Sequence, residues 1–469
     1  MRIYNHGNKN QNQLNLYLCI AFLFISAVAY ASFFLNISPL INPLVYFAVL
    51  VPVFATYGWI VHLSLKSPQK LSPLLLHLIL FALLFRIIVI FQEPVLSDDV
   101  FRYIWDGRVS INGINPYRYA PTHENLRFLR DSEIYPHINF PDIATVYPPF
   151  AQLFFAFNAI IGNTIFSWKI VLLVLELFLT FVLLKLIHHF NLNSMRLFIF
   201  TLNPLVIIET YQNGHIEIIG LVFFWFSILL FFRQKAWQSI MAATLATMTK
   251  FLPLVMFLPF LIKKFWRKFL LIVSAVTVVI LPFFLDDTIP MAGFISYANR
   301  WSFNGSMFKV GTALLNWIGI RSHEIGIYNL NGHLETVYIN TEFYYKILAA
   351  VVLLIVIIDQ MRKVKILADF ATVRFIQAGF IIGGTLLLLL PTLHPWYLIW
   401  VIPFLIFLPR WSWLVFTFLI QFAYFVLKNY HEAGIWEESV WVLVLQYIPF
   451  YALLIYEYLD RKRIRGWML

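Results

Sequence analysis

The chain alternates between long apolar runs and shorter polar segments. An apolar run of about 17 to 25 residues is long enough to cross a bilayer as an α-helix. We predict such spans near residues 14–35, 43–65, 72–92, 167–189, 197–212, 216–234, 268–285, 344–360, 371–391, 397–409, 411–428 and 440–459. The pattern therefore predicts an all-α polytopic membrane protein that forms a single integral-membrane domain, 1–469.

Two further apolar segments do not fit a simple span. The segment 147–162 is short and begins with a proline pair, so we expect a helix that lies in or dips into the membrane interface. The segment 238–262 is interrupted by Lys250 and Pro253. We expect it to form two short helices that enter and leave on the same side, as broken helices do where they line a polar cavity. These segments bring the expected total to about 13–14.

The basic residues favour one orientation in the membrane. They gather in short clusters between the predicted helices: Lys66/Lys70, Lys185/Arg196, Arg233/Lys235, Lys263–Lys268, Arg362/Lys363/Lys365/Arg374 and Arg461–Arg465. With the N-terminus inside, all of these clusters fall on the cytoplasmic face. The two long polar stretches, 93–166 with its interfacial helices and 286–343, then become extracytoplasmic loops. We expect both termini in the cytoplasm and a location in a bacterial inner membrane.

Composition supports the membrane assignment and excludes other classes. The chain is 61% hydrophobic and 12% charged, whereas soluble proteins carry about a quarter charged residues. The formal net charge of +11 does not indicate a nucleic-acid partner, because the basic residues lie at helix ends. The single cysteine, Cys19, excludes an intrachain disulfide and a cysteine-rich metal site.

The first long loop concentrates the groups that could carry chemistry. Asp98 and Asp99 follow an apolar helix, and Arg102, Tyr103 and Asp106 come within three helical turns. Spacings of three and four residues place Arg102, Tyr103 and Asp106 on the same helix face as Asp99. A carboxylate there can accept a proton from a hydroxyl nucleophile, and a nearby arginine can hold a phosphate. The alternative is a salt-bridged helix end without catalytic function.

The loop also carries motifs that resemble those of a known superfamily. The run Asp98-Asp99-x-x-Arg102-Tyr103…Asp106-Gly107, followed by Asn115-Pro116-Tyr117 and Tyr147-Pro148-Pro149, resembles the GT-C integral-membrane glycosyltransferases. The closest branch is that of the polyprenyl-phosphate-mannose-dependent mannosyltransferases. In that superfamily an acidic residue of the first exterior loop is the catalytic base. The resemblance implies this role for Asp99, which has an arginine three and a tyrosine four residues later, with Asp98 as second choice.

Residues elsewhere could complete such a site. For the donor phosphate we expect cationic or histidine partners: Arg102, Lys250 and His394, the last because similar superfamily members use a late exterior-face histidine or arginine there. For the sugar or the acceptor we expect polar and aromatic partners: Tyr103, Asp106, Tyr147, Glu209, His215, Glu217, Trp301, Trp396 and Tyr397. The His215-Ile216-Glu217 run could hold a divalent cation, but two ligands alone are a weak metal signal.

The resulting expectation is a transferase that works in the membrane. It moves a hexose, mannose by resemblance, from a polyprenyl-phosphate-linked donor to a hydroxyl on a glycan, lipid or protein acceptor. One base and a phosphate leaving group fit a single inverting displacement at the extracytoplasmic face, and the sequence requires no cofactor. The alternatives are a transporter or flippase of lipid-linked saccharides, favoured by Arg86 and Lys250 within apolar segments, and a non-catalytic assembly subunit.

Overall fold

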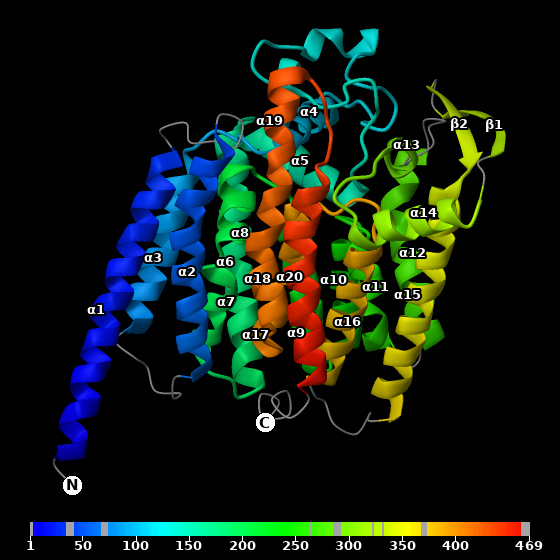
Figure 1. Ribbon diagram of the computed structural model, residues 1–469. Helices are drawn as coiled ribbons and strands as arrows, with labels where there is room; N and C mark the ends of the chain where they lie inside the picture. The colour runs from blue at the N-terminus through cyan, green and yellow to red at the C-terminus, as the bar shows by residue number, and fades with distance from the viewer. Residues whose placement is uncertain are drawn as a thin grey trace. The chain divides into compact units, whose positions relative to one another are not determined.

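The computed structural model describes residues 3–33, 42–66, 74–261, 265–284, 292–320, 323–330, 333–366 and 373–460. Helices dominate this part of the chain (Figure 1). Five of the described helices are long and apolar enough to cross a membrane: Pro43–Lys66, Ile165–His189, Thr341–Val364, Trp411–Ala433 and Val440–Leu459. The expected all-α polytopic fold is therefore confirmed, and the total of 13–14 membrane segments stays a prediction.

The chain packs as two compact units. Unit 1 comprises Met1–Leu96, Leu183–Asn213 and Leu405–Leu469, and unit 2 comprises Ser97–Val182 and Gly214–Phe404. Every site residue expected from the sequence lies in unit 2, with the exception of Glu209. The expectation of one domain over 1–469 stays a prediction.

Unit 1 is built from helices of very different lengths. Its elements are α1 (Ile3–Ser32), α2 (Pro43–Lys66), α3 (Leu74–Ile90), η4 (Ser194–Leu197), α7 (Phe198–Thr201), α8 (Pro204–Ile207), η5 (Ile208–Gln212), α18 (Trp411–Leu419), η8 (Ile420–Phe425), α19 (Val426–Ala433) and α20 (Val440–Leu459). The long helix α6 (Ile165–His189) begins in unit 2 and ends here. In Figure 1, α1 begins and α20 ends at the same end of this unit. The expected cytoplasmic location of both termini stays a prediction.

One predicted span of unit 1 differs from the structure. The segment 197–212 is four short helical pieces rather than one helix. Pro204 cannot continue a helix because it lacks an N–H, so α8 starts anew there. The Asn203 side chain caps this start by accepting a hydrogen bond from the Leu205 N–H at 3.0 Å. The last piece, η5, is a π-helix, a form often found at functional sites.

Unit 2 contains the two long polar stretches and the helices that follow them. Its elements are α4 (Asp99–Ile111), η2 (Glu124–Leu129), η3 (Tyr135–His137), α5 (Pro149–Ile161), α9 (Glu217–Phe232), α10 (Ala236–Thr247), α11 (Leu252–Phe257), η6 (Leu258–Leu261), α12 (Phe265–Phe284), α13 (Ala292–Arg300), α14 (Ser306–Trp317), β1 (His323–Leu330), β2 (His333–Ile339), α15 (Thr341–Ile366), α16 (Arg374–Leu389) and η7 (Pro395–Trp400). The short helix α17 (Phe404–Phe407) begins at its last residue.

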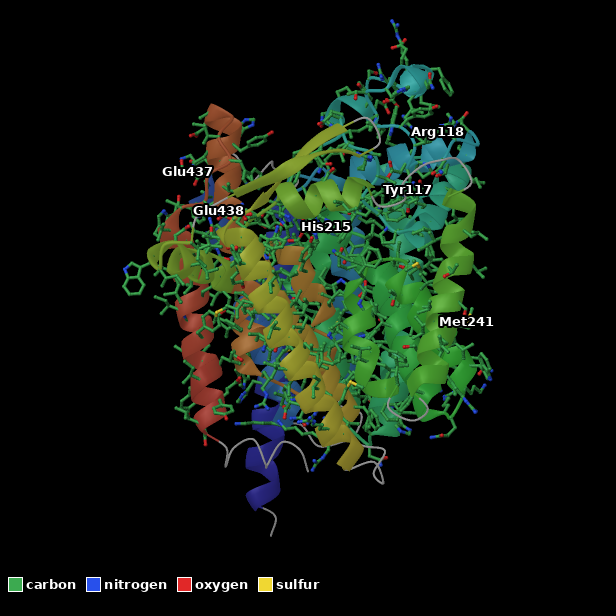
Figure 2. The ribbon with its side chains drawn as sticks, turned by 90° about the vertical axis from the view of Figure 1, so that its right-hand side faces the viewer. Tyr117, Arg118, His215, Met241, Glu437 and Glu438 are labelled. Atoms are coloured by element: carbon green, nitrogen blue, oxygen red, sulfur yellow. The ribbon has the colours of Figure 1, made fainter. Side chains whose placement is uncertain are left out.

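Both polar stretches lie at the same end of unit 2. Figure 1 shows the chain after α4 at the upper end of the helices, together with α13, α14 and the hairpin of β1 and β2. The two strands pair antiparallel from His323 opposite Ile339 to Leu330 opposite His333. Figure 2 places Tyr117 and Arg118 in this loop-rich part and Met241 on the outer side of α10. The two expected extracytoplasmic loops thus share one end of unit 2, and the helices and hairpin of the second stretch were not predicted.

Two helix predictions for unit 2 are confirmed, and a third span differs. The Tyr-Pro-Pro segment begins the short helix α5, with Pro149 in its first turn. The segment 238–262 forms the short helices α10, α11 and η6, and Lys250 lies in the break between the first two. The predicted span 397–409 instead begins within a 3₁₀-helix, η7, whose first residue is Pro395.

Close packing of α4 on α5 depends on Gly107. A Cβ atom at this position would lie 2.3 Å from the carbonyl oxygen of Phe155 and 3.2 Å from the Cβ of Ala159. Backbone atoms cannot yield as a flexible side chain can, so only glycine fits this crossing. The contact holds the helix that begins with Asp99 against the helix that begins after Tyr147.

Gly107→Ala is therefore expected to destabilise the protein. Overpacking of a tight contact typically costs about 1–3 kcal/mol, which would lower the midpoint of thermal unfolding in detergent. Gly58→Ala is the matched control, because a Cβ at this helical glycine meets nothing within 4 Å. It should leave the midpoint unchanged or raise it, since alanine favours helix more than glycine does. Equal midpoints for the two variants would contradict the role of Gly107.

Candidate active site

Asp99 is the first residue of α4 and its carboxylate is held by several neutral donors. The Asn139 side-chain N–H donates to Asp99 Oδ1 at 2.8 Å, and the side chains of Tyr103 and Tyr147 also hydrogen-bond this carboxylate. The backbone N–H of Asp99 donates to Ser97 Oγ at 3.3 Å. The Asp99 side chain nevertheless remains 21% exposed. The carboxylate is thus fixed in direction and still open to a reactant.

The environment makes Asp99 a better proton acceptor than an exposed aspartate. Burial raises the pKa of its carboxyl above the usual value, and the hydrogen bond from Asn139 and the positive charge of Lys250 lower it only in part. A base with a higher pKa removes a proton from a hydroxyl more readily, provided that it is ionised at the working pH. Asp98, the residue before it, is exposed.

Asn139→Ala should move the acidic limb of the pH–rate profile. Catalysis by an ionised Asp99 is lost as the pH falls through the pKa of this group. Asn139 stabilises the ionised form, so its removal raises that pKa further, and the limb should shift to higher pH. The measurement is kcat/KM for sugar transfer as a function of pH. Asn112→Ala, an exposed asparagine that donates to Arg108 O, should leave the limb in place, and an unmoved limb in Asn139→Ala would argue against Asp99 as the titrating base.

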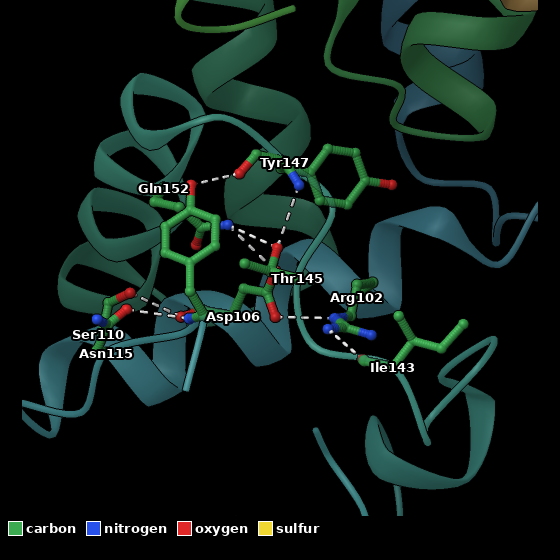
Figure 3. A network of polar contacts seen from close by, with 9 residues as sticks. Arg102, Asp106, Ser110, Asn115, Ile143, Thr145, Tyr147 and Gln152 are labelled. Atoms are coloured by element: carbon green, nitrogen blue, oxygen red, sulfur yellow. Dashed lines mark hydrogen bonds and ion pairs between the residues drawn. The ribbon is translucent and has the colours of Figure 1, made fainter. Parts of the chain in front are cut away.

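Arg102 and Asp106 form an ion pair on the buried side of α4 (Figure 3). Arg102 Nε lies 2.8 Å from Asp106 Oδ1, and Arg102 Nη2 donates to the carbonyl oxygen of Ile143 at 2.9 Å. The Thr145 hydroxyl donates to Asp106 Oδ2. Gln152 donates to Thr145 Oγ1 at 2.8 Å. Both charged groups are therefore engaged within the protein.

This network positions Tyr147. The Tyr147 N–H donates to Thr145 Oγ1 at 3.3 Å, and the Tyr117 hydroxyl donates to the Tyr147 carbonyl oxygen at 2.6 Å. The rings of Tyr103 and Tyr147 meet edge to face at 5.0 Å. Arg102 and Asp106 are paired with each other, and their expected contacts with donor phosphate and with sugar stay predictions.

Lys250 brings a positive charge to the site. It lies in the break between α10 and α11, and its Nζ contacts Glu217 Oε1 at the start of α9. The same Nζ lies 4.0 Å from the centre of the Tyr397 ring, a cation–π contact. The Lys250 side chain is 26% exposed and that of Glu217 only 1%. The lysine charge also acts on Asp99, so acid and cation share one site.

Two histidines and a tryptophan form a stack beside these charges. The Trp396 ring lies between His215, at 3.9 Å, and His394, at 4.2 Å between ring centres. His215 Nδ1 is 3.8 Å from Asp99 Oδ2. Burial, followed by the charge of Lys250, lowers the pKa of His215 and reduces that of His394 to about 3. Both rings are therefore neutral at pH 7, and His394 would meet a phosphate as a hydrogen-bonding group rather than as a cation.

The second polar stretch contributes aromatic residues that sequence reasoning partly missed. Tyr297 on α13 places its hydroxyl 3.3 Å from that of Tyr397, and its ring stacks on Trp301 at 5.2 Å. Trp301 also meets Phe140 edge to face at 3.9 Å. Phe140 is the neighbour of Asn139, so this contact joins the second stretch to the residue that holds Asp99. Neither Asn139 nor Tyr297 stands in a motif that could have identified it.

Glu209 is engaged inside unit 1. Its carboxylate accepts hydrogen bonds from the Tyr424 hydroxyl at 2.8 Å, from Gln421 at 3.4 Å and from Asn213 at 3.1 Å. Glu209 is fully buried among these partners, and its expected contact with a sugar stays a prediction. In the residues that the structure describes, no group of three or more His, Cys, Asp or Glu side chains could hold a metal ion. The divalent cation considered from the sequence stays a prediction.

The apolar helices and a family match together identify a membrane glycosyltransferase of the GT-C type. Residues 32–267 match the family described as alpha-(1→6)-mannopyranosyltransferase, N-terminal domain, and the chain belongs to this family. It is a mannosyltransferase of the membrane. The matched region includes Asp99, Glu217 and Lys250, whereas His394 and Tyr397 lie beyond it. No curated protein and no solved structure matches the chain.

Proposed function

We propose that the protein transfers mannose from a polyprenyl-phosphate-linked donor to an acceptor hydroxyl at the extracytoplasmic face, with inversion and with Asp99 as general base. The observation that carries this proposal is the pairing of a partly exposed carboxylate with a partly exposed lysine in one site. A transfer of this kind needs a proton acceptor for the nucleophile and a cation for the leaving group.

The reaction follows from these two groups. The acceptor oxygen attacks the anomeric carbon of the mannosyl group from the side opposite the phosphate, and a new C–O bond forms. The bond between the anomeric carbon and the phosphate oxygen breaks, and its electron pair stays on the phosphate. The acceptor proton passes to Asp99, which later releases it to water. The products are the mannoside and polyprenyl phosphate.

Other residues of the site would assist each partner. Lys250 would stabilise the negative charge that develops on the leaving phosphate. Trp396 and Tyr397 offer ring faces on which a sugar can lie, as aromatic side chains present apolar surfaces beside polar edges. Tyr103 and Tyr147 would hold Asp99 in the direction of the acceptor hydroxyl, since both already hydrogen-bond its carboxylate.

A lipid-linked donor suits this chain better than a nucleotide sugar. The sequence contains no nucleotide-binding domain, and spanning helices flank the polar stretches that carry the site. The bias of basic residues toward the opposite loops supports an extracytoplasmic site in a bacterial inner membrane. The acceptor would be a glycan, lipid or protein hydroxyl, and no cofactor is needed for the displacement.

The test is transfer by purified protein in lipid nanodiscs. Synthetic polyprenyl-phosphate mannose and GDP-mannose are offered separately with octyl α-mannoside as acceptor, and products are followed by mass spectrometry. The proposal predicts mannosylated acceptor and free polyprenyl phosphate from the lipid donor alone. Product from GDP-mannose alone would overturn the donor assignment. Movement of the lipid-linked sugar across proteoliposomes without transfer would instead favour a flippase.

The two residues that favour a flippase in the sequence, Arg86 and Lys250, have other partners in this structure. Arg86 donates to the carbonyl oxygens of Ala82 at 2.7 Å and Thr201 at 2.8 Å, and its guanidinium lies over the Tyr211 ring. These contacts tie α3 to the broken segment that follows α6. Lys250 contacts Glu217 in the site with Asp99. Each of these cations thus has contacts that need no transport path.

A further inference from the structure

Glu217 and Lys250 form an unusually one-sided ion pair. Glu217 is almost fully buried, and Lys250 contacts only its Oε1 atom. The second carboxylate oxygen, Oε2, is also buried and has no hydrogen-bond partner among the described residues. A buried carboxylate depends strongly on its cation, because removal of the partner leaves a charge without compensation. Glu217 therefore holds Lys250 through one oxygen, and its only other stabilising contact among the described residues is with its own backbone N–H.

Several groups of the site interact with the positive charge of Lys250. Its Nζ contacts Glu217 and lies over the Tyr397 ring, and its charge also acts on Asp99, His215 and His394. The two histidines are neutral at pH 7, and the tyrosine offers only its ring face. The charge of Lys250 thus acts on two carboxylates, on Glu217 in direct contact and on Asp99 at longer range. Any phosphate that enters must compete with Glu217 for the charge of Lys250.

The chemistry of the transfer makes this competition matter most at the end of the reaction. The lipid-linked donor is a phosphodiester with one negative charge. The product is a phosphomonoester, which carries about −1.5 to −2 at pH 7 because its second pKa is near 6. The product therefore binds a lysine more strongly than the donor does. An enzyme that held its product in this way would be slowed by its release.

We propose that Glu217 is a product-release residue, which recaptures Lys250 and so displaces the polyprenyl phosphate after transfer. This inference rests on the proposed function, since the competing anion is the leaving group of that reaction. Glu217 is a positioning residue in this scheme, because it acts through Lys250 and not on the reacting atoms. Its unpartnered oxygen fits the role, since a fully satisfied carboxylate would have no need to recapture the lysine.

The experiment measures binding of farnesyl phosphate, a short product analogue, by isothermal titration calorimetry on full-length protein in nanodiscs. Glu217→Gln is expected to bind it about tenfold more tightly, equivalent to about 1.4 kcal/mol. Farnesol, which lacks the phosphate, should bind both proteins equally. Glu217→Asp keeps the charge and should resemble the wild type. In a Lys250→Met background the effect of Glu217→Gln should shrink to under about twofold, because a buried carboxylate without its cation is neutralised.

Kinetics separate this role from a merely structural one. In Glu217→Gln both kcat and KM for the lipid donor should fall, and the inhibition constant of farnesyl phosphate should fall by the same factor as its Kd. A structural defect would lower kcat without tightening any anion. Thermal unfolding of each variant shows that the protein compared is folded.

Two results would overturn the inference. A folded Glu217→Gln protein that binds farnesyl phosphate no more tightly than the wild type rejects product release by Glu217 and leaves the proposed transfer standing. A wild-type protein that binds farnesyl phosphate no better than farnesol rejects the phosphate donor itself, and this inference with it. Because binding requires no turnover, the two failures are distinguishable.

Discussion

Asp99→Asn is expected to abolish mannosyl transfer. The amide has the shape of the carboxylate but cannot accept a proton from the acceptor hydroxyl. General base catalysis typically contributes about 10²–10⁴-fold to the rate, so kcat should fall by at least about a hundredfold. Binding of the lipid donor should change little, because the charge of Lys250 remains. The measurement is single-turnover transfer from polyprenyl-phosphate mannose.

Asp98→Asn is the matched control for that variant. Asp98 carries the same side chain one residue earlier and is exposed, whereas Asp99 is held by Asn139 and the two tyrosines. The control should retain activity within a few fold. Full activity in Asp99→Asn, or a loss confined to Asp98→Asn, would move the base to the other carboxylate.

Lys250→Met should have the second largest effect. Methionine keeps most of the apolar length of the lysine and removes the ammonium that we propose stabilises the leaving phosphate. Loss of one group that stabilises charge in a transition state typically costs about 10²–10³-fold, and kcat/KM should fall by that amount. The acidic limb of the pH–rate profile should also move to higher pH, because the lysine lowers the pKa of Asp99.

Lys346→Met serves as the control for the lysine. Lys346, on α15, donates to the carbonyl oxygen of Ala298 at 3.0 Å, and it makes no described contact with Asp99 or Glu217. Its replacement should leave kcat/KM within a few fold and the acidic limb unmoved. A Lys250→Met protein as active as this control would exclude Lys250 from the reaction.

The membrane fold was largely predictable because apolar runs must match the thickness of the bilayer. The break at Lys250 was equally visible, since a lysine and a proline interrupt one apolar segment. The segment 197–212 was misjudged because hydropathy does not register that Asn203 caps a new helix at Pro204. Hydropathy also does not indicate helices α13 and α14 or the hairpin after them, because these elements are too polar and too short to read as membrane spans.

The site was predictable in its centre and less so in its partners. Asp99 follows from its place at the end of an apolar helix and from the superfamily resemblance. The partner of Arg102 could not be predicted from spacing. Arg102 lies three residues after Asp99 and four before Asp106, so it could pair with either carboxylate. In the structure it forms a buried ion pair with Asp106. Asn139 reaches Asp99 across about 40 residues of chain. No local pattern indicates such a contact, which only the folded loop creates.

The most direct test is a structure of the protein in nanodiscs with a non-transferable phosphonate analogue of polyprenyl-phosphate mannose. The account predicts a phosphonate oxygen about 3 Å from Lys250 Nζ, with the anomeric carbon facing an acceptor or water hydroxyl that Asp99 also contacts. An analogue bound with its anomeric carbon out of reach of any group on Asp99 would contradict it.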